Sequence, residues 1–212
     1  MLTLYGYWRS SASYRVRIAL GLKGVEARHI AVNLREGEQR GDEHLTRNAQ
    51  GYVPVLELPD GTQLTQSLAI MDFLDASYDV NPFMPRDAVT RSKILSASLT
   101  IAADIAPIQN LSVLNYLRRE FAADDTQVKD WSAHWISKGF DALEPRVAEN
   151  KQDFYLSDHP AFFEICLIPQ IYNARRFGID MTRYPALSEV EARCQILPAF
   201  KAARPENQPD AF

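Results

Sequence analysis

The stretch Trp8-Arg9-Ser10-Ser11-Ala12-Ser13-Tyr14-Arg15-Val16-Arg17 joins a short apolar run to a helical pattern. The run Leu2 to Tyr5 predicts a strand, and the pattern predicts a helix from Ser11 to Lys23, where Gly24 ends it. The hydroxyl groups of Ser10 and Ser11 would then lie at a helix N-terminus, where backbone N–H groups and the helix dipole favour an anion such as a thiolate. The alternative is that one serine only caps the helix, because serine is a preferred N-cap residue.

Strand and helix patterns alternate through the rest of this first part of the chain. Residues 27–32 predict a second strand, and the polar residues 35–48 predict a loop that holds one irregular helix. Pro59-Asp60-Gly61 has turn chemistry, so residues 53–58 and 62–64 are expected to form a hairpin. A further helix follows the hairpin. This order predicts a small α/β domain at residues 1–80, with a βαβ unit followed by ββα.

Two prolines in Asn81-Pro82-Phe83-Met84-Pro85 interrupt the pattern, because proline cannot continue a helix and stiffens a connection. We expect a linker at residues 81–86. Beyond it strand signals are absent, and residues 87–212 are predicted to form a larger all-helical domain with a proline-containing tail from 197. The apolar stripes that support this prediction are Ile94, Ala97, Ile101, Ile105 and Ile108, and Val128, Trp131, Trp135 and Ala142.

Composition excludes several classes of protein. The chain has 212 residues, 46% of them hydrophobic and 24% charged, which is enough to bury a substantial core. The N-terminus has no basic leader before an apolar run, and no stretch approaches the roughly 20 apolar residues of a membrane span, so we expect a soluble cytoplasmic protein. The net charge of −4 disfavours nucleic acid as a partner. Cys166 and Cys194 are too few for a disulfide framework and lack the neighbours of a zinc site.

Three features leave alternatives open. Pro54, in Tyr52-Val53-Pro54, is either an ordinary edge-strand proline or part of a cis peptide that turns the Val53 backbone outward to pair with another main chain. Gln66-Ser67 heads a helix and is either a simple cap or a second carboxylate-binding N-terminus. Arg15 and Arg17 lie within the first helix and are either surface residues or ligands.

At these residues the sequence resembles the zeta class of glutathione transferases, whose members include maleylacetoacetate and maleylpyruvate isomerases. The matching blocks follow one another along nearly the whole chain, and chance would not produce that order. They are Arg9 to Leu20, Val53-Pro54, Gln66 to Ile70, Gln109 to Leu114, Arg176-Phe177 before Tyr184-Pro185, Leu197 to Phe200, and Asn207 to Asp210.

The resemblance implies a thioredoxin-like domain that binds glutathione, followed by an all-helical domain. In this class of enzyme Ser10 would donate a hydrogen bond to the glutathione sulfur, which lowers the pKa of a thiol from about 8.5. The implied site, in full, is Arg9, Ser10 and Ser11 for catalysis; Ser10, Gln39, Val53, Pro54, Gln66, Ser67 and Asn110 for glutathione; and Arg9 and Arg176 for the substrate.

The implied reaction is the cis–trans isomerisation of a maleyl-type diacid by reversible addition of the glutathione thiolate to the double bond. Rotation then occurs in an enolate, and glutathione returns unchanged. Guanidinium groups of Arg9 and Arg176 suit the two carboxylates, and one of them would stabilise the developing oxyanion. Maleylacetoacetate and maleylpyruvate both fit, as part of aromatic amino acid or aromatic acid degradation. The class also implies a homodimer.

Two other functions compete with the isomerase. One is a general transferase that conjugates glutathione to electrophiles such as halogenated acids, and the other is a noncatalytic interaction module. Retention of Ser10, Pro54 and Gln66-Ser67 argues against the module, since a scaffold has no physical need for them.

The sequence departs from the zeta pattern at three places. Ala12 stands where Cys or Thr is common, and Ala106 where His or Gln is common, so turnover or substrate preference would differ. The third departure is at Pro160-Ala161-Phe162-Phe163-Glu164, where the superfamily usually places a Ser/Thr capping box closed by Asp. Because Ala161 cannot accept a hydrogen bond, we expect Asp158, Ser157 or water to satisfy the first-turn amides of that helix.

Overall fold

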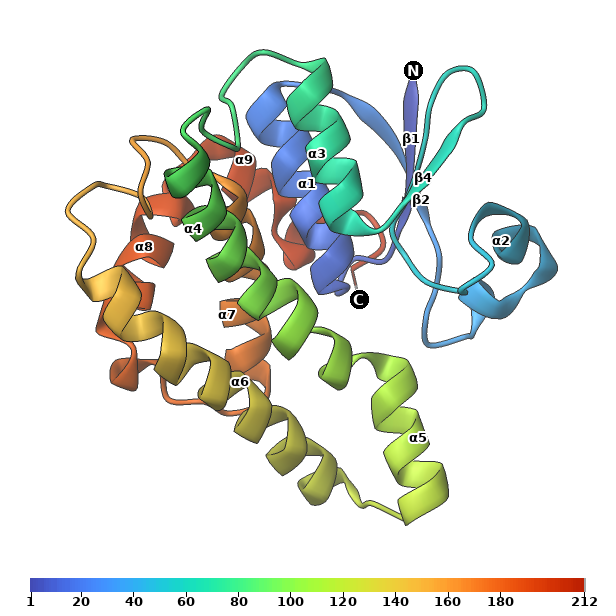
Figure 1. Cartoon of the computed structure of the whole chain (residues 1–212). Helices are drawn as coiled ribbons and strands as arrows, with labels where there is room; N and C mark the ends of the chain where they lie inside the picture. The colour runs from blue at the N-terminus through green and yellow to red at the C-terminus, as the bar shows by residue number, and fades with distance from the viewer. Residues whose placement is uncertain (212) are drawn as a thin grey trace. The chain divides into compact units, whose positions relative to one another are not determined.

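The computed structural model describes residues 1–211, which form two compact units (Figure 1). The first unit comprises Met1–Pro82 and the segment from Gln195 onward, and the second comprises Phe83–Cys194. The first unit contains a mixed sheet with helices, and the second is built from helices, as the sequence predicted. The boundaries drawn at residues 80 and 86 stay a prediction about domains.

The sheet of the first unit has four strands in the order β2-β1-β3-β4. Strand β1 (Leu2–Gly6) pairs in parallel with β2 (Ala27–Ala31) and antiparallel with β3 (Val55–Glu57), which in turn pairs antiparallel with β4 (Gln63–Thr65). The predicted strands and the hairpin are therefore confirmed, with a shorter first limb in the hairpin and a second limb shifted by one residue. This topology places β1 inside the sheet, so the turn that follows β1 starts from a fixed position.

Helix α1 (Ser11–Lys23) packs against α3 (Ser67–Ser77), and Figure 1 shows the two helices together on one side of the sheet with α2 on the other. Gly24 ends α1 in the left-handed conformation with φ of 65°, as predicted from its position. The polar loop contains two short helices, η1 (Glu38–Arg40) and α2 (Asp42–Arg47), where the sequence indicated one.

Lys23, the last residue of α1, is only 4% exposed. Its Nζ has three protons to donate and lies within hydrogen-bond distance of four acceptors, Asp75 Oδ1 at 2.8 Å and the carbonyl oxygens of Tyr78, Val80 and Asn81 at 2.9, 2.8 and 3.1 Å. A buried ammonium group needs such partners, since an unpaired one is costly. This lysine therefore joins the C-terminal ends of α1 and α3.

The C-terminal segment differs in its placement from the prediction that assigned it to the helical part. Helix α9 (Pro198–Ala203) packs against α1, and η5 (Pro205–Asn207) follows it. The packing depends on Gly21, because a Cβ atom there would lie 3.1 Å from the Cβ of Ala199. A helical pattern alone does not indicate which neighbour a short helix chooses, so the sequence could not assign it.

The second unit consists of helices. The first predicted apolar stripe is confirmed, because Ile94, Ala97, Ile101 and Ile105 are buried. The second was wrong in part: Val128 is buried, but Ala142 is exposed, and the buried face of that helix continues instead through Ser132, Ile136, Phe140, Leu143 and Val147. The elements are α4 (Ala88–Leu99), η2 (Thr100–Ile105), η3 (Pro107–Gln109), α5 (Leu111–Phe121), α6 (Asp125–Ala148), α7 (Phe162–Arg176), η4 (Met181–Arg183) and α8 (Pro185–Gln195).

Element η2 is a turn of π-helix, in which the Ala106 N–H donates to the Ile101 carbonyl at 2.8 Å. It faces Gly139 of α6, where an added Cβ would lie 2.1 Å from Ile105 Cδ1. Contrary to the expectation from the sequence, the run Ala88–Phe121 is long and apolar enough to cross a membrane by length and composition, although η2 and η3 divide it. Its apolar stripe contributes to the core of the second unit.

Neither Ser157 nor Asp158 caps the N-terminus of α7. Ala161 provides no side-chain hydrogen bond, and the Ser157 hydroxyl instead accepts from the His159 N–H at 3.3 Å. The Glu164 carboxylate closes this end of the helix, because it accepts from the Ala161 N–H at 2.9 Å and from the Tyr155 N–H at 2.7 Å. A first-turn glutamate thus satisfies two backbone donors that a threonine cap would leave to other groups.

Candidate active site

The turn between β1 and α1 is held by three hydrogen bonds. The Ser10 N–H donates to the Tyr7 carbonyl at 3.0 Å, and the Tyr7 N–H donates to Ser13 Oγ at 3.3 Å. Ser10 Oγ in turn accepts from the Ser13 N–H at 3.2 Å, which makes Ser10 the N-cap of α1. Ser10 is therefore fixed in position by the fold.

The two interpretations of Ser10 are compatible. A hydroxyl group that accepts a hydrogen bond as a cap still has its own proton to donate, and a thiolate is a suitable acceptor. The first turn of α1 contains no acidic residue, so its N-terminal dipole is not neutralised by a side chain of that turn. The cap and the anion site thus share one side chain.

Ser11 and Arg9 flank Ser10. Ser11 is the first residue of α1, and both side chains are partly exposed. The Arg9 guanidinium lies 5.4 Å from the centre of the Trp8 ring, a cation–π distance. The indole therefore limits the directions that the Arg9 side chain takes.

The N-terminus of α3 carries Gln66 and Ser67. Gln66 is the N-cap residue but makes no side-chain cap hydrogen bond, so the simple-cap alternative does not describe it. Its backbone has φ of 65°, a conformation that strains a residue with a Cβ. Its Nε2 donates to Gln50 Oε1 at 2.9 Å. As in α1, the first turn has no acidic residue.

Arg15 connects the two helix N-termini. Its Nε donates to Ser67 Oγ at 3.1 Å, and the side chain is 5% exposed. Arg17 is also buried, at 7%, so the surface alternative for both arginines was wrong. Because Ser67 Oγ accepts from Arg15, its hydroxyl proton remains to be donated, and a carboxylate is a natural acceptor.

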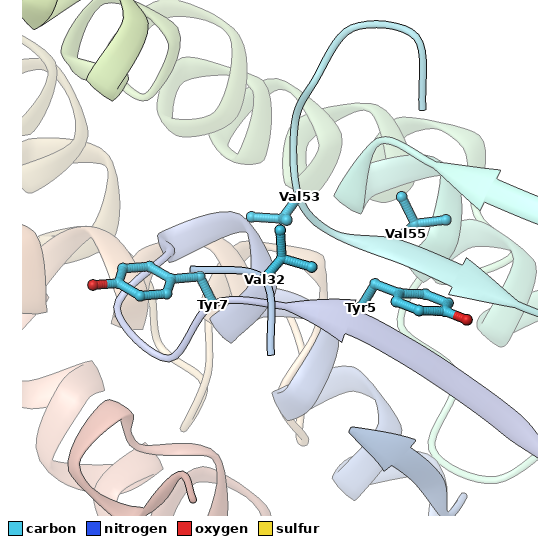
Figure 2. Close-up of a cluster of buried hydrophobic side chains, with 5 residues drawn as sticks. All are labelled: Tyr5, Tyr7, Val32, Val53 and Val55. Carbon is cyan, nitrogen blue, oxygen red and sulfur yellow. The ribbon is translucent and has the colours of Figure 1, made fainter. Parts of the chain in front are cut away.

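The segment before β3 lies beside the turn at the start of α1. The Val53–Pro54 peptide is cis, which is one of the two alternatives that the sequence left open. The Tyr52 carbonyl accepts from Asn48 Nδ2 at 2.9 Å and contacts His44 Nε2 at 2.9 Å. In Figure 2 Val53 and Val32 lie side by side between Tyr7 and Tyr5, in one buried cluster with Val55. The cluster fixes Val53 relative to Tyr7.

Gln39, in η1, approaches the same segment. A Cβ on Gly51 would lie 3.0 Å from the Gln39 carbonyl oxygen, and Gly51 has φ of 65°. A side chain at this position would therefore be both crowded by Gln39 and strained in its backbone. Gln39 Oε1 is buried and has no hydrogen-bond partner within residues 1–211. A buried acceptor without a donor costs about 1–3 kcal/mol, so this oxygen suits a ligand N–H.

Asn110 and Arg176 belong to the second unit, where buried amide groups connect the segments that carry them. The Arg176 Nη1 donates to Asn173 Oδ1 at 2.7 Å, and Asn173 Nδ2 donates to Gln109 Oε1 at 2.6 Å. Gln109 precedes Asn110, the N-cap residue of α5, and its Nε2 donates to Gln170 Oε1 at 3.0 Å. Sequence reasoning missed Gln109, Asn173 and Gln170, although Gln109 begins one of the matched blocks.

A mixed four-stranded sheet followed by a helical unit is the architecture of the glutathione transferase fold. Residues 1–76 match the family "Glutathione S-transferase, N-terminal domain". A probable maleylacetoacetate isomerase from Vibrio cholerae is 43% identical over 212 residues, which cover 99% of this chain and 98% of that protein.

Two solved structures extend the likeness. One is a holo structure of a maleyl pyruvate isomerase, described as a bacterial zeta-class glutathione S-transferase, with 38% identity, a TM-score of 0.96, and coverage of 99% of this chain and 100% of that one. The other is a maleylacetoacetate isomerase from Anaeromyxobacter dehalogenans with dicarboxyethyl glutathione and citrate in its active site, with 38% identity, a TM-score of 0.89, and coverage of 100% and 98%. The chain therefore belongs to the zeta class of glutathione transferases.

Proposed function

We propose that this protein is a glutathione-dependent isomerase that converts maleylacetoacetate or maleylpyruvate to the fumaryl isomer. The observation that carries the proposal is Ser10, a cap residue whose hydroxyl proton remains available at a helix N-terminus without first-turn acids. The names of the relatives support the reaction. Dicarboxyethyl glutathione, present in the structure of one relative, is the product expected when a thiolate adds to a four-carbon unsaturated diacid.

The first unit would hold glutathione through groups at its helix N-termini and the Val53 segment. Ser67 and the first-turn amides of α3 suit the γ-glutamyl carboxylate, and Gln66 lies beside them. Val53 would offer its main chain to the peptide, next to Pro54, and Gln39 Oε1 would accept from a ligand N–H. In the second unit Asn110 is the further candidate contact.

Bound glutathione supplies a thiolate that adds reversibly to the cis double bond, so that rotation about a single bond becomes possible. Ser10 would donate its hydroxyl proton as a hydrogen bond to the sulfur and thereby keep the thiol deprotonated at neutral pH. Ser11, at the first position of α1, would assist through its hydroxyl or its N–H. Both contributions favour the anion more than the neutral thiol.

Arg9 and Arg176 would bind the two carboxylates of the substrate. A guanidinium group binds a carboxylate through two parallel hydrogen bonds, which fixes orientation as well as charge. An arginine next to the developing oxyanion would also stabilise charge where it forms in the transition state. Asn173 restricts the Arg176 guanidinium, and the Trp8 ring restricts that of Arg9. Orientation of this kind reduces the entropy lost in the reaction.

The setting of the enzyme is part of the proposal. We infer a cytoplasmic homodimer that acts on a small diacid in the degradation of aromatic amino acids or aromatic acids, with neither nucleic acid nor membrane as a partner. The formal net charge of −4 supports the absence of a nucleic-acid role.

The test is an ultraviolet assay of both diacids with and without glutathione, at equal enzyme concentration. We expect isomerisation that requires glutathione but does not consume it. A conjugation assay with a halogenated acid and with a neutral electrophile runs in parallel. Conjugation without isomerisation would replace the proposal with the general transferase, and no glutathione-dependent turnover of any substrate would favour the noncatalytic module.

A further inference from the structure

The peptide groups just before Ser10 are held from a second side by residues that the proposed mechanism does not use. Arg17 Nη2 donates to the Trp8 carbonyl at 2.9 Å, and Arg17 Nη1 donates to the Tyr7 carbonyl at 3.5 Å. The Trp8 N–H donates to Asp210 Oδ2 at 3.0 Å. Both backbone polar groups of Trp8 are thus bound by side chains, one from α1 and one from the C-terminal segment.

Arg17 is itself firmly placed. Its Nε donates to the Ala203 carbonyl at 3.1 Å, and its guanidinium lies 5.3 Å from the centre of the Tyr14 ring. Burial lowers the pKa of Arg17 to about 10, while the nearby Tyr14 and Asp210 act in the opposite direction. The guanidinium therefore stays charged at neutral pH, and three backbone carbonyl groups share that charge.

The C-terminal segment is a packed part of the first unit. Helix α9 lies against α1 at Gly21, and Gln208 Nε2 donates to the carbonyl oxygens of Ala202 and Arg204 at 2.9 and 2.8 Å. A cavity of about 30 Å³ next to Arg17 and Asp210 has room for about one water molecule. This space is too small for a substrate, and a larger hollow of about 360 Å³ is lined by Arg17 but not by Asp210. What the two charged residues share is their hydrogen bonds to the backbone of Trp8.

We propose that Arg17 and Asp210 are positioning residues, which fix the Tyr7–Trp8 backbone so that Arg9 and Ser10 face glutathione and the diacid correctly. The inference rests on the proposed function, because it assumes that Ser10 contacts the sulfur. Rotation of the Trp8 peptide would redirect both following side chains. Reacting groups tolerate such errors poorly: a displacement of about 1 Å can reduce a rate roughly a hundredfold.

Three variants test the role of Asp210. Asp210→Ala removes the acceptor of the Trp8 N–H, and we expect kcat to fall about tenfold to a hundredfold and the pKa of bound glutathione to rise. Asp210→Asn keeps an oxygen acceptor and should recover most of the activity. Asn207→Ala is the matched control, because Asn207 Nδ2 donates to Lys201 O at 2.6 Å within the segment and does not bind Trp8. It should behave like the wild type.

The readouts separate failure of the inference from failure of the proposed function. The pKa of bound glutathione is measured from thiolate absorbance and needs no diacid, and chemical denaturation is measured on the same samples. A wild-type enzyme that isomerises the diacid while Asp210→Ala matches it in kcat and thiol pKa would overturn the positioning role. So would a loss of activity that follows the unfolded fraction while the thiol pKa is unchanged. A wild-type protein without isomerase activity would instead refute the function itself.

Discussion

Two helix N-termini in this protein meet the same physical problem in opposite ways. Helix α1 begins at Ser10, whose hydroxyl caps one amide, and its first turn contains no acid. Helix α7 begins at Ala161 without a side-chain cap, and its own Glu164 accepts from two N–H groups. The first end remains ready for an external anion, whereas the second is closed by a carboxyl group of the helix itself.

The comparison also shows that N–H donors alone do not determine whether an acidic group near a helix N-terminus is ionised. Glu164 accepts two hydrogen bonds that lower its pKa, yet complete burial outweighs them and raises the pKa to about 7. At the partly exposed Ser10 the penalty of desolvation is smaller, so we expect the thiolate to be favoured. We therefore expect the exposure of a helix N-terminus to decide whether it stabilises a charged group.

The largest effect is expected at the N-terminus of α1, from the loss of the Ser10 hydroxyl. Ser10→Ala removes the proposed donor to the sulfur and should reduce kcat about 10²–10³-fold, with glutathione affinity nearly unchanged. Ser11→Ala is the neighbouring control and should cost less. Steady-state kinetics with saturating glutathione measures both variants. Equal rates for Ser10→Ala and the wild type would transfer the proposed role to Ser11.

At the N-terminus of α7, Glu164 should make the free energy of unfolding depend on pH. Because the pKa of Glu164 rises from 4.5 to about 7 on folding, the folded state retains a proton that the unfolded state loses between these values. The free energy of unfolding should then fall by about 3 kcal/mol as the pH rises through that window, and change no further above it from this group.

Glu164→Gln removes this titration, so the difference in unfolding free energy between wild type and variant isolates it. Urea denaturation at several pH values from 4.5 to 8 gives the two curves. If the wild type instead gained stability relative to the variant as the pH rises, the hydrogen bonds from Ala161 and Tyr155 would outweigh burial.

A third helix end sharpens the comparison. Ser67→Ala, at the N-terminus of α3, removes one donor to the γ-glutamyl carboxylate and should raise the KM for glutathione by roughly tenfold to 150-fold with little change in kcat, since a hydrogen bond to a charged group is worth about 1.5–3 kcal/mol. Ser77→Ala, at the exposed C-terminal end of the same helix, is the control. A fall in kcat at constant KM would show that Ser67 acts on the reaction instead.

The smallest effect is expected from adding a cap to α7. Ala161→Ser should raise the free energy of unfolding by about 0.5–2 kcal/mol, and Asp87→Ala should lower it by a similar amount, because Asp87 Oδ2 caps α4 by accepting from the Thr90 N–H at 2.8 Å. Denaturant midpoints at constant slope measure both. An unchanged midpoint for Ala161→Ser would mean that a hydroxyl group at position 161 adds no stability beyond that of the hydrogen bonds which Glu164 already accepts.

The sequence predicted the sheet, the helix that begins at Ser11 and the helical second half, because these follow from local patterns of apolar residues, glycine and proline. It did not predict what Arg15 and Arg17 do. Their partners, Ser67, Ala203 and the Trp8 carbonyl, come from distant segments, and a helical pattern contains no information about them. The same limit explains the placement of α9 against Gly21.

The site was predicted through motifs, and the structure adds how its residues are held. The sequence left Ser10 with two alternatives because a cap and an anion site have the same signature, and the hydrogen bond from the Ser13 N–H shows that the cap is real. For α7, the pattern correctly excluded a cap from Ala161 but missed Glu164, whose second donor is the Tyr155 N–H nine residues earlier. Bonds of that kind depend on the path of a loop.

The most direct test of the central claim is a pH titration of glutathione bound to the wild type and to Ser10→Ala, followed by thiolate absorbance. We expect the wild-type protein to lower the thiol pKa below the value of about 8.5 for a free thiol, and Ser10→Ala to return it toward that value. Identical titrations for both proteins would contradict the claim that the N-terminus of α1, through Ser10, is built to hold a thiolate.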